Sequence, residues 1–163
     1  MKAALVILAV AAAAVVARAA AVPAAPAPPT RTCAQGISYD GPPYWGGKGA
    51  LVVGPLSFSG LADHPGGARQ PDGRWFVKSV LLMKPGAAVT LSLVPGSTAR
   101  AVLVYAYRES QAVRFEPCDG TNAKFSGGFL VRRLACATVV VRVEGGGTYR
   151  RRIDFRGFLG GRC

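Results

Sequence analysis

Short apolar stretches separated by Gly and Pro fill the chain from residue 50 onward, without a sustained periodicity of 3.6 residues. The clearest stretch alternates strictly, because Val89, Leu91 and Leu93 fall on one face and polar residues fall on the other. Pro-Gly pairs interrupt the central stretches about every ten residues. The predicted strands are 50–53, 56–61, 75–84, 88–94, 101–107, 112–116, 128–132, 137–143 and 148–155.

Many short strands at this spacing predict an all-β fold. We expect a single antiparallel β-sandwich, immunoglobulin-like or jelly-roll-like, with about seven to nine short strands stapled by disulfides. The sequence after Pro23 has no helical pattern and no internal repeat, so it predicts one domain.

The N-terminus has the pattern of an export signal. Lys2 precedes an uncharged run of Ala, Val, Leu and Ile at 3–17, which is shorter than the roughly 20 residues that span a bilayer. Ala19-Ala20-Ala21 then offers small residues to a signal peptidase. An uncleaved N-terminal anchor is the alternative, and either interpretation predicts a secreted or cell-envelope protein. The expected organisation is a signal peptide at 1–21, a Pro/Ala-rich linker at 22–32 and a β-sandwich domain at 33–163.

Four cysteines, Cys33, Cys118, Cys136 and Cys163, follow the predicted signal. They show no C-x-x-C spacing and the chain has one histidine, so we expect no metal site. Export favours disulfides, for which three pairings are possible. We favour Cys118 with Cys136, which are close in sequence, and Cys33 with Cys163, which would tie the chain ends together.

The motifs VRFEPC at 113–118 and FSGGF at 125–129, followed by Cys136 before a Val-rich strand, carry a resemblance. They resemble an arrangement in small uncharacterised exported β-sandwich proteins of GC-rich bacteria, most clearly in the C-terminal third. The resemblance implies a disulfide between Cys118 and Cys136 on a β-sandwich. It implies no activity and no functional residues.

The chain is strongly basic, with 20 Lys and Arg against 8 Asp and Glu and a net charge of +12. Such a charge attracts anionic polymers, although GC-rich coding alone also enriches Arg. In the last predicted hairpin, alternate valines of 137–143 face inward, so Arg142, Arg150 and Arg152 share the outward face. Like charges on adjacent strands are unfavourable, so this cluster indicates an anionic partner or a solvated face. Arg151 has inward parity, which requires a rim position or a bulge.

A second candidate for binding is the aromatic segment 39–47, which contains Tyr44 and Trp45. Aromatic rings on a rigid loop can stack on sugars or proline-rich chains. The alternative is that both rings cover an end of the sandwich, as apolar rings normally do.

Catalytic patterns are weak. His64 follows Asp63 in a Pro- and Gly-rich segment, but the sequence has no Gly-x-Ser-x-Gly elbow to supply a nucleophile. The carboxylates are scattered, and no pair is marked as a glycosidase pair. Phosphate-loop and dinucleotide patterns do not occur. We therefore expect no catalytic residue and no cofactor.

These features predict a non-catalytic binding or structural module for an anionic or carbohydrate polymer, such as an anionic cell-wall polymer or a polysaccharide. We expect no specific nucleic-acid partner, and membrane contact only through an uncleaved N-terminal segment. The alternative is a secreted hydrolase or enzyme inhibitor that uses the 63–74 loop.

Overall fold

The structure, a computed structural model, describes residues 26–38, 44–62, 67–97, 100–132 and 136–155. The predicted signal peptide at 1–21 lies outside the described residues. Within them, no helix has the length and apolar character that crossing a membrane requires. A short 3-10 helix, η1 (Cys33–Gln35), interrupts a structure otherwise made of strands and turns.

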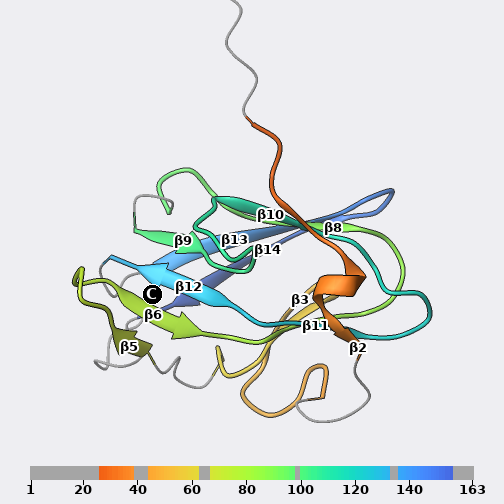
Figure 1. Ribbon diagram of the computed structural model, residues 1–163, viewed down its shortest axis with the longest axis horizontal. Coiled ribbons are helices and arrows are strands. Elements are labelled where there is room, and N and C mark those ends of the chain that lie inside the picture. Colours follow the sequence, from red (N-terminus) through yellow and green to blue (C-terminus); the bar gives the residue numbers. More distant parts are fainter. Residues whose placement is uncertain (1–25, 39–43, 63–66, 98–99, 133–135, 156–163) are drawn as a thin grey trace, which may run out of the picture.

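The described strands form three sheets (Figure 1). Sheet A consists, in order, of β1 (Thr30–Arg31), β10 (Ala112–Phe115), β8 (Val89–Leu93), β13 (Cys136–Val143) and β14 (Thr148–Asp154). Sheet B consists of β2 (Ile37–Ser38), β11 (Ala123–Phe125), β7 (Leu81–Met83), β4 (Leu56–Phe58) and β3 (Leu51–Val53). Sheet C consists of β5 (Gly67–Arg69), β6 (Trp75–Lys78), β12 (Gly128–Val131) and β9 (Ala101–Leu103). Among these neighbours, β1 and β10 run parallel and the other pairs are antiparallel.

Sheets B and C continue into each other through two bent strands. β6 leads into β7 and β11 leads into β12, while β6 pairs with β12 and β7 with β11. At the bend, the backbone N–H of Ser79 donates to the carbonyl of Gly127 at 3.0 Å. A Cβ on Gly128 would clash with the carbonyl of Val77, so the close approach of the chains requires glycine there. Sheets B and C are therefore two parts of one layer.

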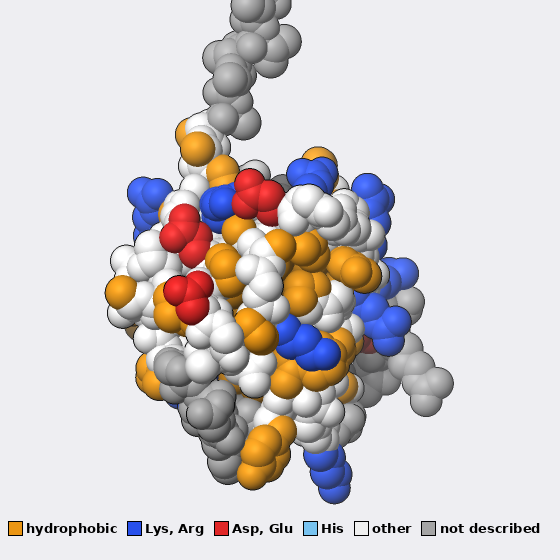
Figure 2. Space-filling model, turned by 90° about the vertical axis from the view of Figure 1, so that its right-hand side faces the viewer, with side chains coloured by type: hydrophobic (Ala, Val, Ile, Leu, Met, Phe, Trp, Pro, Cys, Tyr) orange, Lys and Arg blue, Asp and Glu red, His pale blue; other side chains and the backbone are white. Residues whose placement is uncertain are grey.

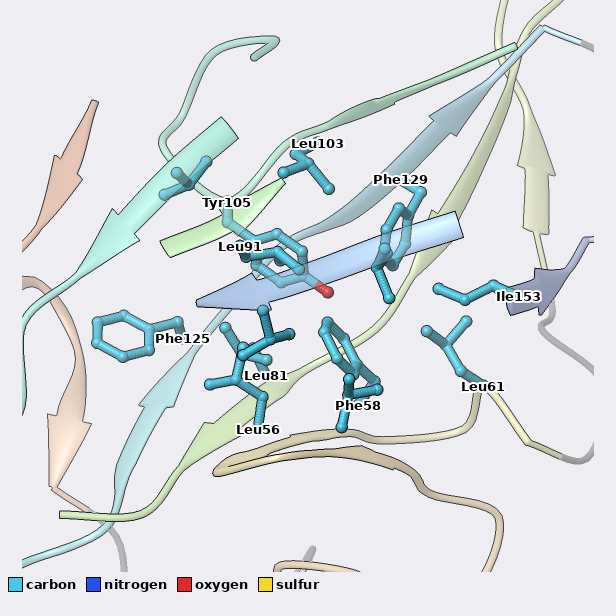
Figure 3. Packing of buried hydrophobic residues seen from close by; sticks show 14 of the residues in the cluster. Leu56, Phe58, Leu61, Leu81, Leu91, Leu103, Tyr105, Phe125, Phe129 and Ile153 are labelled. Atoms are coloured by element: carbon cyan, nitrogen blue, oxygen red, sulfur yellow. The ribbon is translucent and has the colours of Figure 1, made fainter. Parts of the chain in front are cut away.

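One hydrophobic core joins all three sheets. Leu91 of sheet A, Phe58 of sheet B and Phe129 of sheet C are fully buried and belong to one cluster (Figure 3). The Phe58 and Phe129 rings lie 6.1 Å apart, and the ring of Tyr105 lies 5.9 Å from that of Phe129. The Tyr105 hydroxyl donates to the carbonyl of Ser79 at 2.9 Å, so its polar atom is satisfied at the bend. Burial raises the pKa of Tyr105.

The prediction of an all-β, antiparallel fold with a disulfide is confirmed. The prediction of a single sandwich of about seven to nine strands is wrong, because the described residues form three sheets with more strands. The predicted strand 75–84 is in fact two strands separated by the bend, and short strands such as β1, β2, β5 and β11 were not predicted. The predicted alternation in β8 is confirmed, since its alternate residues are buried.

The predicted disulfide pairing is also wrong. Cys33 is bonded to Cys118, with a Cα–Cα distance of 5.1 Å, and not to Cys163. The parallel pairing of β1 with β10 places Arg31 beside Phe115, so the segments that follow both strands stay together until the cysteines meet. Phe115, three residues before Cys118, pairs with Val89, which pairs with Val143 at the far end of β13, whereas Cys136 begins β13. Cys118 and Cys136 therefore lie toward opposite ends of sheet A. Cys136 is disulfide-bonded as well, and Cys163 lies outside the described residues.

Candidate functional site

The hairpin β13–β14 presents arginines on one face of sheet A. In its register, Val140 lies opposite Arg150, and Thr138 opposite Arg152. Arg142 has the same parity on β13, and the three arginines are exposed. The structure therefore places Arg142, Arg150 and Arg152 on one outward surface, which we call the arginine face. Their role in binding stays a prediction.

Two acidic side chains border the arginine face. Glu144, at the hairpin tip, forms an ion pair with Arg114 of β10 at 2.6 Å. Asp154 lies at the other end of β14, where it also has an interaction partner. No ion pair between described residues engages an arginine of the arginine face. Its three guanidinium groups are therefore available to an anion.

Arg151 is exposed although its parity points it toward the inner side of sheet A. The register of β13 with β14 is continuous from Cys136 to Arg142, so the hairpin has no bulge there. Arg151 therefore occupies a rim position at the edge of the sheet. Consecutive arginines on an edge strand also discourage pairing with another chain, which is a structural reason for the same residues.

The aromatic segment has two different parts. Tyr44 is 66% exposed, whereas Trp45 is partly buried and donates from Nε1 to the carbonyl of Pro55 at 3.3 Å. The next residue, Gly46, donates its N–H to Oγ of Ser57 at 3.0 Å, and Ser57 is fully buried on the outward face of β4. Trp45 thus lies against the turn at Pro55, while Tyr44 remains open to solvent. Residues 39–43 of the segment lie outside the described residues.

The fold brings together two carboxylates that the sequence did not mark as a pair. Arg74 contacts Asp72 through Nε at 2.6 Å and Glu109 through Nη2 at 2.7 Å. With Gly73 and Arg132, these residues line an open hollow of about 530 Å³. Glu109 comes from the segment between β9 and β10 and Arg74 immediately precedes β6, so only tertiary structure reveals the cluster.

The electrostatics of this cluster do not fit glycoside hydrolysis. Hydrogen bonds from the backbone N–H and the side chain of Arg74 lower the pKa of Asp72. The side-chain hydrogen bond from Arg74 lowers the pKa of Glu109. Both carboxylates are therefore ionised at neutral pH, whereas a glycosidase keeps one carboxyl protonated as the acid. The cluster gives no support to the hydrolase alternative.

Two further candidates concern a metal site and His64. No group of three His, Cys, Asp or Glu side chains there could hold a metal ion. His64, with the beginning of the 63–74 loop, lies outside the described residues. Protein-family models, curated proteins and solved structures gave no match to this chain.

Proposed function

We propose that the protein is an exported, non-catalytic module that binds an anionic polymer through the arginine face. The observation that carries this proposal is the exposure of Arg142, Arg150 and Arg152 on one surface without an ion pair among the described residues. Like charges on neighbouring strands repel, so this surface costs stability until an anion offsets the repulsion.

The covalent structure supports export. The Cys33–Cys118 bond is of the kind that persists in oxidising compartments and is rare in the cytosol. The expected signal peptide at 1–21 agrees with this location. Outside the cell, acidic polysaccharides and phosphate-rich wall polymers are plausible partners of a basic surface.

The spacing of the arginines favours a repeating anion. Arg150 and Arg152 are two residues apart on one strand, which corresponds to about 7 Å. Guanidinium groups bind carboxylate, sulfate or phosphate through paired hydrogen bonds. Because the groups are exposed, binding should be weak and should fall steeply with salt, since the screening length is about 8 Å at 0.15 M.

The test compares two variants with the same loss of charge. One carries Arg142→Gln, Arg150→Gln and Arg152→Gln. The control carries Arg69→Gln, Arg100→Gln and Arg132→Gln, which change exposed residues in or next to the strands of sheet C. Binding of inorganic polyphosphate is measured by calorimetry at low and physiological salt, after circular dichroism confirms folding. We expect the first variant to lose about ten-fold more affinity than the control. Equal losses would show that only total charge matters, and would overturn the proposal.

A further inference from the structure

The turn between β3 and β4 joins the aromatic segment to the arginine-rich hairpin. On one side, Trp45 donates its indole N–H to the carbonyl of Pro55. On the other side, the ring of Tyr149, from β14, lies against Gly54. Two rings that are far apart in sequence thus flank one turn, at Gly54 and Pro55.

Tyr149 is held in place but remains open to solvent. A Cβ on Gly54 would lie 2.5 Å from Cδ2 of the ring, so only glycine allows this contact. The φ angle of Gly54 is 57°, a conformation that also favours glycine. Near the other end of the ring, a Cβ on Gly147 would lie 3.5 Å from the hydroxyl. The ring is nevertheless 45% exposed, so it offers a fixed aromatic surface.

One cation lies against the Trp45 ring, and a second shares the side of β14 that carries Tyr149. The backbone N–H of Lys84 donates to the carbonyl of Pro55 at 3.1 Å, and its Nζ lies 3.9 Å from the centre of the Trp45 ring. Arg151 follows Tyr149 by two residues and has the same parity on β14. Neither cation forms an ion pair with a described residue. Glu144, the acid at the hairpin tip, is held by Arg114 of β10.

One end of the molecule carries apolar and basic side chains close together. Figure 2 looks at the end where the β13–β14 hairpin tip and the loop between β7 and β8 lie. Hydrophobic side chains surround a basic one near the middle of the view, acidic side chains lie at the upper left with basic ones beside them, and further basic ones lie at the top and to the right. Apolar and basic surface therefore meet near the middle of this end.

We propose that Trp45, Tyr149, Lys84 and Arg151 form a subsite for an acidic sugar unit, which we call the turn subsite. The apolar face of a sugar ring packs on an aromatic ring, and a carboxylate or sulfate on the sugar pairs with Lys84 or Arg151. This inference rests on the proposed function and specifies the ligand of that function. The turn subsite and the arginine face lie on the two sides of β14. An acidic polysaccharide that crosses this edge strand would contact both surfaces.

Single-stranded nucleic acid also combines rings with negative charge, so the test must distinguish it from an acidic polysaccharide. The described disulfide favours an extracellular polymer, and polysaccharides are the abundant acidic polymers with rings in that compartment. A polymer without rings, such as polyphosphate, should use the arginine face alone.

The experiment measures binding of three probes to the secreted, disulfide-bonded protein at low salt: oligogalacturonate, inorganic polyphosphate and oligothymidylate. We expect Tyr149→Ala to lower the affinity for oligogalacturonate about three- to ten-fold and to leave polyphosphate binding unchanged. Tyr107→Ala removes another exposed tyrosine ring, from the segment between β9 and β10, and is the matched control, for which we expect no change.

A second pair of variants tests the cation. Arg151→Gln and Arg150→Gln remove the same charge from adjacent positions on opposite sides of β14. We expect Arg151→Gln to weaken oligogalacturonate more than polyphosphate, and Arg150→Gln to weaken both. Tyr149→Ala without effect on oligogalacturonate, or with equal effects on all probes, would overturn the turn subsite. A loss confined to oligothymidylate would identify nucleic acid and also overturn it. Equal polyphosphate losses in the two triple arginine variants would instead overturn the proposed function.

Discussion

Arg31 is a buried charge that has no acidic partner among the described residues. Its side chain is 2% exposed and donates from Nη1 to the carbonyl of Tyr105 at 2.5 Å and from Nη2 to the carbonyl of Gln35 at 2.6 Å. The guanidinium also lies 4.1 Å from the centre of the Tyr107 ring. Main-chain carbonyls and an aromatic face thus replace water around the charge. These contacts of Arg31 hold β1 against the core.

Replacing Arg31 by Met should therefore be costly. The Arg31→Met variant leaves the buried carbonyl of Tyr105 and the part-buried carbonyl of Gln35 without this donor, and we expect the free energy of unfolding to fall by about 3 kcal/mol. Urea unfolding with intact disulfides measures the change. Arg108→Met is the control, because Arg108 is exposed and should change stability by less than about 0.5 kcal/mol. Similar values for both variants would contradict the structural role of Arg31.

Gly128 lies at the bend between sheets B and C, where it closely approaches the backbone of a neighbouring strand. Alanine at Gly128 would drive a Cβ into the carbonyl of Val77, which belongs to the paired strand β6. We expect Gly128→Ala to destabilise the protein by about 3 kcal/mol, because backbone has to move. Gly120→Ala separates conformational strain from the clash, since Gly120 has a φ of 65° with open space around it and should cost about 1 kcal/mol. Thermal unfolding of both variants would show whether the clash dominates.

Among the strands and their contacts, the sequence predicts those features that depend on a local pattern of residues. The sequence predicts β8 because the apolar residues of this strand alternate with polar ones over five positions. It predicts the arginine face because the alternation of side chains within one hairpin determines which residues share a face. β1 and β2 have two residues each, which is too short for any pattern. The contact of Tyr149 with Gly54, and the cluster around Arg74, depend on segments from different elements. No local pattern can reveal such contacts.

The ion pair of Glu109 with Arg74 fastens the segment between β9 and β10 to the beginning of β6. The pKa of Glu109 is below its ordinary value of 4.5, because Arg74 stabilises the carboxylate. The contribution to folding is thus complete above pH 4.5 and is lost as the pH falls through the lowered pKa. We expect Glu109→Gln to destabilise the protein at neutral pH, and the difference from wild type to disappear in acid.

Urea unfolding of wild type and Glu109→Gln between neutral and acidic pH measures this difference. Glu116→Gln is a matched control, because Glu116 takes part in no ion pair among the described residues. A difference between wild type and Glu109→Gln that stays constant with pH would contradict the role of the ionised carboxylate.

The Cys33–Cys118 bond closes a covalent loop that contains most of the β structure. The two cysteines are 85 residues apart, and closing a loop of that size in the unfolded chain is worth about 4.5 kcal/mol. We expect the variant with Cys33→Ala and Cys118→Ala to lose stability of this order in urea unfolding. Peptide mapping without reduction should recover Cys33 linked to Cys118. Recovery of Cys118 linked to Cys136 would contradict the structure.

Under the proposed export, the same bond has a consequence for how the protein matures. Cys33 and Cys118 are the first and second cysteines of the chain. When a chain emerges with its N-terminus first, Cys33 has no intramolecular partner until Cys118 appears, and Cys136 arrives only later. The first bond that can form is then already the native one. Correct closure during vectorial secretion needs an oxidant but no isomerase, whereas a reduced full-length chain that reoxidises in solution can choose among all its thiols.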